Sequence, residues 1–423
     1  FGLGCALAGL GGALQLPKGG ADLLMDFTIL APAFVVVVVG GMGSLPGAAL
    51  AAVIVSVANV LGVAYLPQST LVLIFVVMAL VLMIRPHGLF GTAEAPPAET
   101  AVTEPERPLA LPSRPERTAI AALLVVLAAL PWWGSSFAPV LATDILIFCL
   151  FAASLHFIIG LGGLVSFGHA AFYGGGAYVA ALAVRDAGAP MELALLLAPL
   201  GAACLAGLIG WFCIRLSGVY FAMLTLAFAQ FLWSIAFQWA EVTGGDDGIL
   251  GLWPSAWASS VEGYYGLTLA LAAGGILGLR RLAHSPLGYA LRASRDSADR
   301  AAASGIDVKR VQWAAFALAG MMAGLAGGLF LFSKGSIFPN ELEIARSFDV
   351  LIVVFLGGIK TLAGPVVGAA GFEYVEDWLT RLDTWRLWLG LSVIAIVVLM
   401  PEGIVGTLRL WWERLRALRS KTA

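Results

Sequence analysis

The stretch VVFLGGIKTLAGPVVGAA, residues Val353–Ala370, has a near repeat earlier in the chain. The earlier stretch, VVVVGGMGSLPGAA at Val36–Ala49, also ends a short apolar run in a Gly-Gly pair and begins another apolar run a few residues later. Paired glycines weaken a helix because they add backbone entropy and bring no side chain. We therefore expect a broken or half-length helix before each pair, at Phe27–Val39 and Phe348–Leu356.

Two more pairs of segments keep the same order. FGLGCALAGLGGAL at Phe1–Leu14 resembles FALAGMMAGLAGGL at Phe316–Leu329, and RPHGLFGT at Arg85–Thr92 resembles MPEGIVGT at Met400–Thr407. The offset is 315 residues at the first pair, 317 at the Gly-Gly pairs and 315 at the last. Because the Gly-Gly spacing and the Pro-x-Gly ending are not general features of membrane helices, we interpret the pattern as an internal repeat.

The repeat divides the chain into two related units of unequal size. Residues 1–91 match only the last third of a unit, so we expect the natural polypeptide to begin upstream of Phe1. Residues 92–117 hold six of the twenty prolines and predict a solvated linker. Residues 118–403 form a complete second unit. In residues 404–423, apolar and Trp residues alternate with arginines, which predicts an amphipathic helix along the cytoplasmic leaflet.

The composition places the chain in a membrane. Of its 423 residues, 60% are hydrophobic and 12% charged, and the mean hydropathy is +0.93; a soluble domain has about 25% charged residues. This excludes an ordinary soluble enzyme, and a net charge of −2 gives no basic field for nucleic acid. We expect an all-α, polytopic transmembrane bundle with half-length helices and a short cytoplasmic coupling helix.

Apolar runs that could cross a bilayer recur along the chain. They lie near residues 1–16, 47–66, 68–85, 118–133, 144–160, 169–184, 191–214, 219–240, 263–281, 309–332, 364–380 and 386–400. If these runs cross alternately, 18 of the 24 Lys and Arg residues share the side of the linker. The positive-inside rule then predicts that the linker, residues 282–308 and the C-terminus are cytoplasmic, and that residues 241–262 are external.

The segment HSPLGYALRASRDSADRAAASGIDVKR, His284–Arg310, predicts a short helix lying along the membrane. Pro286 can open a helix, good helix formers run from Tyr289 to Ala303, and Gly305 suits a C-terminal cap. One face is charged and another is built of alanines, so a partner could dock closely. The alternative is a solvated basic loop that only satisfies the positive-inside rule.

No residue pattern supplies a driving force for transport. The five lysines do not follow glycine as a phosphate-binding loop requires, so we expect no ATP site and no cofactor in this chain. Asp144 and His156 look isolated, and we see no chain of membrane carboxylates or histidines that could carry protons. The sequence also holds no metal-ligand spacing and no catalytic constellation.

Four segments, taken together and in order, resemble the branched-chain amino acid permeases of bacterial ABC importers. They are LGGLVSFGHAAFYGGGAYVAAL at Leu161–Leu182, TGGDDGI at Thr243–Ile249, SPLGYALRASRDSADRAAASGIDV at Ser285–Val308 and FLGGIKTLAGPVVGA at Phe355–Ala369. Residues 118–423 resemble the second permease subunit of such a system, and residues 1–91 resemble the C-terminal part of the first. The chain is thus similar to a fusion of the two.

The resemblance implies a set of partners and contacts. It implies two ABC ATPase subunits, a periplasmic substrate-binding protein, pairing of permease units and residence in the bacterial inner membrane. The segment Pro286–Gly305 matches the loop that docks into the ATPase, and only one such loop lies in this chain. The contact candidates are Arg292, Ala293, Arg295, Asp296 and Gly305.

Two Gly-rich segments are candidates for the solute pathway. Irregular backbone at membrane depth needs cover from protein or water, which suits a broken helix at Ser166, Phe167, Gly168, His169 and Phe172. His169 could contact the solute or could be a hydrogen-bonded packing residue. On the outer face, Thr243, Gly244, Gly245 and Asp246, with Asp247, could gate the mouth, meet a binding protein or form a plain turn.

The Gly-Gly pairs leave two interpretations open. Gly40, Gly41, Gly357 and Gly358 could be hinges, or they could be places where helices cross closely. For the whole chain, the first hypothesis is a permease that imports branched-chain or related amino acids. Urea, short amides or another small organic solute remain alternatives, a stand-alone channel or secondary carrier is less favoured, and a structural scaffold would transport nothing.

Overall fold

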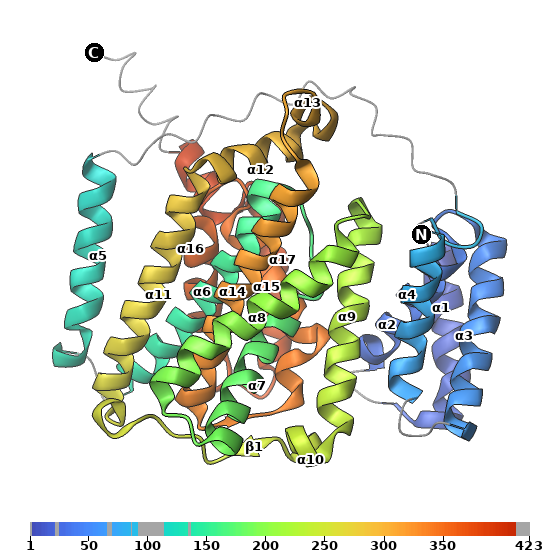
Figure 1. The fold of residues 1–423 in the computed structure, drawn as a ribbon, viewed down its shortest axis with the longest axis horizontal. Helices are drawn as coiled ribbons and strands as arrows, with labels where there is room; N and C mark the ends of the chain where they lie inside the picture. The colour runs from blue at the N-terminus through green and yellow to red at the C-terminus, as the bar shows by residue number, and fades with distance from the viewer. Residues whose placement is uncertain are drawn as a thin grey trace.

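The computed structural model describes residues 2–21, 25–65, 70–85, 87–91, 114–133 and 137–411. Within these ranges the chain is a bundle of α-helices with one two-residue antiparallel ribbon (Figure 1). The first group of helices is α1 (Gly2–Gly19), α2 (Met25–Gly40), α3 (Leu45–Tyr65) and α4 (Thr70–Ile84).

The main body begins at α5 and holds the remaining elements. They are α5 (Arg114–Trp133), α6 (Ala138–Gly162), α7 (Ala170–Ala187), α8 (Met191–Cys213), α9 (Gly218–Gln238), α10 (Ala240–Thr243), η2 (Gly245–Asp247), β1 (Ile249–Leu250), η3 (Ala256–Ala258), α11 (Val261–Ala283), α12 (Pro286–Asp296), α13 (Ala298–Ala303), α14 (Val308–Lys334), β2 (Ser336–Ile337), η4 (Pro339–Leu342), α15 (Ile344–Gly357), α16 (Gly364–Leu379) and α17 (Trp385–Leu399). A further helix, Gly403–Trp411, follows α17 at an angle of 41°.

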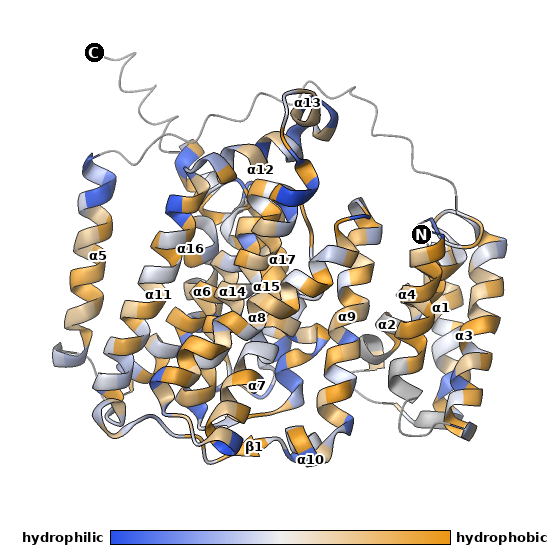
Figure 2. Cartoon of the chain, in the orientation of Figure 1, coloured by the Kyte–Doolittle hydropathy of each residue, from blue (hydrophilic) through white to orange (hydrophobic). Residues whose placement is uncertain are grey.

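The surface around the bundle is apolar, as a lipid-facing surface must be. Figure 2 shows hydrophobic residues along the sides of the helices and hydrophilic ones gathered toward the ends. In the described part, α3, α5, α6, α8, α9, α11 and α14 are each long and apolar enough to cross a membrane. The predicted runs that form α1, α4, α7, α16 and α17 are helices of 15 to 18 residues, about 22–27 Å long. The chain is therefore a multi-pass membrane protein, in which several shorter helices lie among the spans.

The core is built around α14, which packs on α6, α7 and α8 and approaches α7 and α8 closely through small residues. A Cβ at Gly324 would overlap the Ala202 methyl group, and one at Gly327 would overlap the Tyr173 backbone. Association inside a bilayer relies on van der Waals packing, because lipid supplies no hydrophobic driving force between helices. The high glycine content therefore places helix backbones close together.

The sequence repeat is also a repeat of backbone geometry. A Cβ at Gly40 would overlap the Gly47 carbonyl, and a Cβ at Gly357 would overlap the carbonyl of Gly364, which is again seven residues on. The second glycine of each pair has a left-handed backbone, with φ +97° at Gly41 and +110° at Gly358.

The Pro-x-Gly turns close against these same points. Gly88 lies against Gly41, and Gly403, its counterpart by the 315-residue offset, lies against Gly358. In the structure both Gly-Gly pairs are thus close backbone crossings. Helices α2, α3 and α4 occupy the same places in the repeat as α15, α16 and α17.

The N-terminal helices pack on α9 of the main body, with α4 and α2 making the contact. The Tyr220 hydroxyl donates to the His87 carbonyl at 3.3 Å, and the His87 ring meets the Tyr220 ring edge-on at 5.9 Å. Residues 1–91 therefore contact the main body of the same chain directly, in addition to being joined to it by the linker.

The boundaries differ from the predictions in two places. Helix α5 begins at Arg114, inside the predicted linker, because Pro115 suits a first turn and Glu116 suits its positive end. The predicted helix through Ala303 is broken at Ser297, whose extended backbone ends α12 and whose hydroxyl accepts from the Arg300 N–H to cap α13. Residues 92–113 and the tail beyond Trp411 lie outside the described residues.

We expect Gly357→Ala to lower the thermal stability of the protein. The added methyl group must displace the Gly364 backbone, and overpacking of this kind costs about 1–3 kcal/mol. Gly371→Ala in α16 is the matched control, since nothing lies within 4 Å of its Cβ position and alanine favours a helix. Thermal unfolding in detergent measures both variants, and equal melting temperatures would contradict the close crossing.

Candidate functional site

The chain loses helical structure between α6 and α7, at residues 163–169. Helix α6 ends at Gly162, and Gly163 reverses the chain with a φ of +66°. His169, at the other end of this break, bonds to Ser154, which lies eight residues before Gly162. Eight residues of helix rise about 12 Å. The break therefore carries irregular backbone from the end of α6 into the bundle, and α7 begins inside the membrane.

Side chains of α9 and α15 satisfy the backbone of this break. The Phe167 N–H donates to Thr225 Oγ1 at 3.2 Å, and the Ala170 N–H donates to Ser347 Oγ at 2.9 Å. A Cβ at Gly168 would overlap the Thr225 carbonyl, so glycine permits the approach. Backbone polar groups at membrane depth need such partners, since lipid offers none. Sequence reasoning missed Thr225 and Ser347, whose hydroxyl groups support the backbone of this break.

His169 is fully buried within an aromatic cluster. Its Nε2 lies 2.8 Å from the Ser154 hydroxyl, and its ring stacks on Phe151 and meets Phe172 edge-on. The Ser154 hydroxyl donates to the Phe151 carbonyl at 2.6 Å, so we infer that Nε2–H is the donor toward Ser154. This geometry fits a packing residue that holds the start of α7.

The other predicted pathway residues lie beside His169. Ser166 is fully buried and its hydroxyl has no partner among the described residues. Phe167 is half-buried and packs against Phe348 of α15, with ring centroids 5.4 Å apart. The break thus places a pair of partly exposed aromatic rings where α15 meets it.

A charged cavity of about 170 Å³ lies toward the other end of α6. Asp144 forms an ion pair with Lys334 at 2.9 Å, and Arg346 pairs with Glu341 at 3.3 Å. Tyr173 lines the same cavity, and its hydroxyl is buried. The lining residues are Asp144, Ile147, Phe148, Tyr173, Phe330, Lys334, Arg346, Glu373 and Glu376.

The prediction that Asp144 is isolated is wrong, because it pairs with Lys334 and lies with other charged residues around this cavity. Four separate helices bring these charges together, so the linear sequence hides them. A signal was present: Glu373 and Glu376 are three residues apart inside a predicted span, on one helix face. Charges at membrane depth are costly and mark functional sites or tight ion-pair networks.

His156 is also bonded rather than isolated. Its Nε2 lies 2.7 Å from the Ile359 carbonyl, just after the Gly357-Gly358 crossing. The bond ties the middle of α6 to the turn between α15 and α16. It satisfies a carbonyl that the broken helix leaves free.

The predicted docking segment forms α12 and α13, which lie across one end of the bundle, while α10 and β1 lie at the opposite end (Figure 1). Pro286 opens α12, as predicted. Arg295 extends toward the bundle and donates from Nη1 to the Gly160 carbonyl at 2.6 Å. A cation at the C-terminal end of α6 also interacts favourably with the helix dipole. Leu291, fully buried, packs beside Gly162.

The remaining contact candidates differ in exposure. Asp296 and Gly305 are exposed, and Gly305 takes a φ of +85° after α13. Arg292 and Ala293 are half-buried. A partner that docks on this end of the bundle can therefore reach Asp296 and Gly305, while Arg295 connects α12 to α6.

The TGGDDG segment forms α10 and η2 at the opposite end. The buried Thr243 hydroxyl bonds to the Ala236 carbonyl at 2.6 Å, and Gly244 and Gly245 both have positive φ. The chain then pairs β1 with β2, with Ile249 opposite Ile337. Asp246 and Asp247 are exposed. The segment thus joins α9 to the connection between α14 and α15 and presents two carboxylates outward.

We expect Ser347→Ala to destabilise the break. The buried Ala170 N–H would lose its acceptor, which costs about 1–3 kcal/mol, and the start of α7 would loosen. Ser392→Ala is the control, because its hydroxyl bonds to the Trp388 carbonyl on an exposed helix face. The two variants are compared by thermal unfolding, and equal stability would mean that Ser347 does not support the break.

Comparison with known proteins identifies the family of this chain. The family described as branched-chain amino acid transport system / permease component matches residues 1–84 and 139–400. The high-affinity branched-chain amino acid transport system permease protein LivM of Escherichia coli is 28% identical over 314 residues, covering 68% of this chain and 74% of the relative. No solved structure matches significantly.

Two further relatives match this chain over shorter segments. The probable branched-chain amino acid transport permease protein LivH of Methanocaldococcus jannaschii is 30% identical over 158 residues, which is 34% of this chain and 48% of the relative. The xylose transport system permease protein XylH of Escherichia coli is 28% identical over 138 residues, 31% of this chain and 34% of the relative. With most of its residues matched by the family, this multi-pass chain belongs to the permease components of branched-chain amino acid transport systems.

Proposed function

We propose that the chain is the membrane permease of a binding-protein-dependent ABC importer for branched-chain or related amino acids. Family membership supports the transport role. The observation that supports coupling between the docking helix and the bundle is the hydrogen bond from Arg295 to the Gly160 carbonyl. It joins a helix lying across the end of the bundle to the rigid helix α6, which contacts the irregular break.

Under this proposal, ATP is hydrolysed by two separate ATPase subunits that dock on α12 and α13. Asp296 and Gly305 are accessible for such a contact, and Arg292 and Ala293 lie beside them. Movement of α12 would pass through Arg295 to α6 and on to the break at residues 163–169. A periplasmic binding protein would meet the opposite end, where Asp246 and Asp247 are exposed.

The distribution of Lys and Arg supports an inner-membrane orientation with α12, α13 and the C-terminus in the cytoplasm. The charged cavity supports an amino acid as solute, because groups of both signs could complement a carboxylate and an ammonium. The same cavity weakens the argument against an ion-coupled carrier, since charges do gather in the membrane. Dependence on ATP therefore decides between the two mechanisms.

Uptake into proteoliposomes tests the class of transporter. The protein in its complete natural length, with its ATPase subunits and binding protein, should accumulate labelled leucine only when ATP is supplied. Urea and xylose serve as competing solutes. If either displaces leucine at equal concentration, that solute would replace leucine as the assigned substrate. Uptake driven by an ion gradient without ATP would contradict the importer.

Replacing Arg295 tests the coupling. We expect Arg295→Gln to reduce solute-stimulated ATP hydrolysis about ten-fold, because a half-buried charge-assisted hydrogen bond, worth about 1.5–3 kcal/mol, is lost. The ATPase subunits should still bind, since Arg295 extends toward α6. Arg281→Gln, an exposed cation at the end of α11, is the control. Loss of ATPase binding in the Arg295 variant would assign the residue to the docking surface instead.

A further inference from the structure

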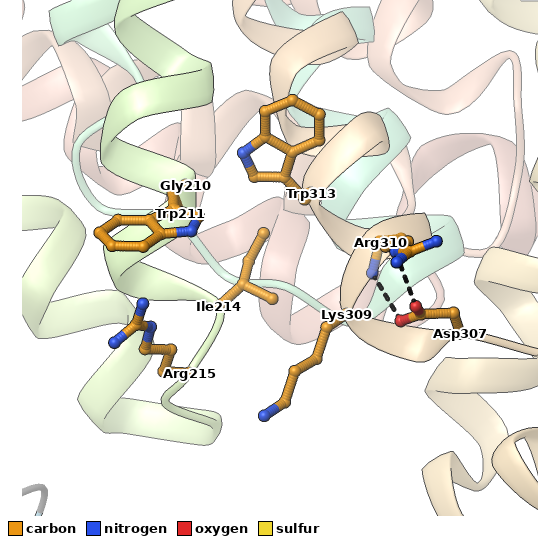
Figure 3. Close-up of a pocket in the computed structure, with 8 residues that line it drawn as sticks. All are labelled: Gly210, Trp211, Ile214, Arg215, Asp307, Lys309, Arg310 and Trp313. Atoms are coloured by element: carbon orange, nitrogen blue, oxygen red, sulfur yellow. Dashed lines mark hydrogen bonds and ion pairs between the residues drawn. The ribbon is translucent and has the colours of Figure 1, made fainter.

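A pocket of about 730 Å³ opens between the end of α8 and the start of α14, on the side of the bundle that carries α12 and α13 (Figure 3). Its volume lies within the range of small-molecule sites. It is separate from the break at residues 163–169 and from the charged cavity. The lining residues are Gly210, Trp211, Ile214, Arg215, Asp307, Lys309, Arg310 and Trp313.

The fixed Trp313 indole and the glycine at position 210 shape the pocket. Trp313 donates from Nε1 to the Gly207 carbonyl at 2.8 Å, which fixes the indole against α8. A Cβ at Gly210 would press on the buried Phe316 at 2.8 Å, so glycine here lets α8 pack closely on α14 beside the pocket. Trp211, Trp313 and Ile214 supply an apolar wall. The pocket is therefore preformed.

The charge of the pocket is unbalanced. Arg310 pairs with Asp307 at 2.9 Å, and the Arg215 guanidinium lies 4.2 Å from the centre of the Trp211 ring. None of the ion pairs within the described ranges includes Arg215 or Lys309. Figure 3 shows these two side chains extending on either side of Ile214. Two exposed cations thus border an apolar hollow.

We propose that this pocket binds an anionic phospholipid, with its phosphate between Arg215 and Lys309 and its upper acyl chains against the two indoles. The pocket lies at the ends of two spans, where Trp side chains favour the membrane interface. Basic pockets between transmembrane helices on the cytoplasmic side bind anionic headgroups. The assignment rests on the proposed orientation. It also places a lipid against the first turn of α14, directly after α13.

Native mass spectrometry of the full chain in neutral detergent, titrated with phosphatidylglycerol or phosphatidylcholine, tests the proposal. Phosphatidylglycerol should bind more tightly. Arg215→Gln/Lys309→Gln should weaken its binding about thirty-fold, from the attraction of two interfacial cations to an anionic lipid. The charge-preserving swap Arg215→Lys/Lys309→Arg should stay within about threefold of the wild type, since an attraction that is mainly electrostatic is retained.

Controls separate the lipid from other sources of binding. Arg281→Gln/Lys360→Gln removes two exposed cations outside the pocket and should leave phosphatidylglycerol binding unchanged. Inorganic phosphate should not displace the lipid, because it lacks the acyl chains. Thermal unfolding checks that each variant is folded. Equal binding by the Arg215/Lys309 variant and the wild type, or equal loss in the control, would overturn the proposal.

Discussion

Backbone polar groups inside a bilayer have no water to bond, and this constraint shapes every irregular point of the structure. The chain leaves helical geometry near Gly40, between Gly162 and Ala170, and near Gly357. At the two Gly-Gly points, helices cross so closely that a Cβ would not fit. At the middle break, Thr225 accepts from the Phe167 N–H and Ser347 accepts from the Ala170 N–H. Each departure from helix is thus covered by protein.

Helix α6 connects the functional features along its length. At one end its Gly160 carbonyl holds Arg295 of α12, in its middle Ser154 holds His169, and at the other end Asp144 pairs with Lys334. Under the proposed mechanism, movement at α12 would act on one largely buried helix that contacts both the break and the charged cavity. Helix α14 packs closely on α6 along the core. This continuity supports the proposed coupling between the two ends of the bundle.

The sequence predicted local features well and long-range contacts poorly. Helix positions followed from apolar runs, half-length helices from the Gly-Gly pairs, and the start of α12 from Pro286. The break at Ser297 was missed because serine is a tolerable helix residue that also caps. The charged cavity was missed because Asp144, Lys334, Arg346 and Glu373 lie far apart in the chain. Thr225 and Ser347 carry no motif, and only the fold reveals what they bond.

Hydrogen bonds to α9 and α15 hold the break at residues 163–169 within the helical bundle. Hydrogen exchange of the protein in lipid nanodiscs, read by mass spectrometry, measures this directly. We expect the amides of Phe167 and Ala170 to exchange slowly, as those of the α6 core do. Exchange as fast as in the exposed turn at Asp246 and Asp247 would contradict it.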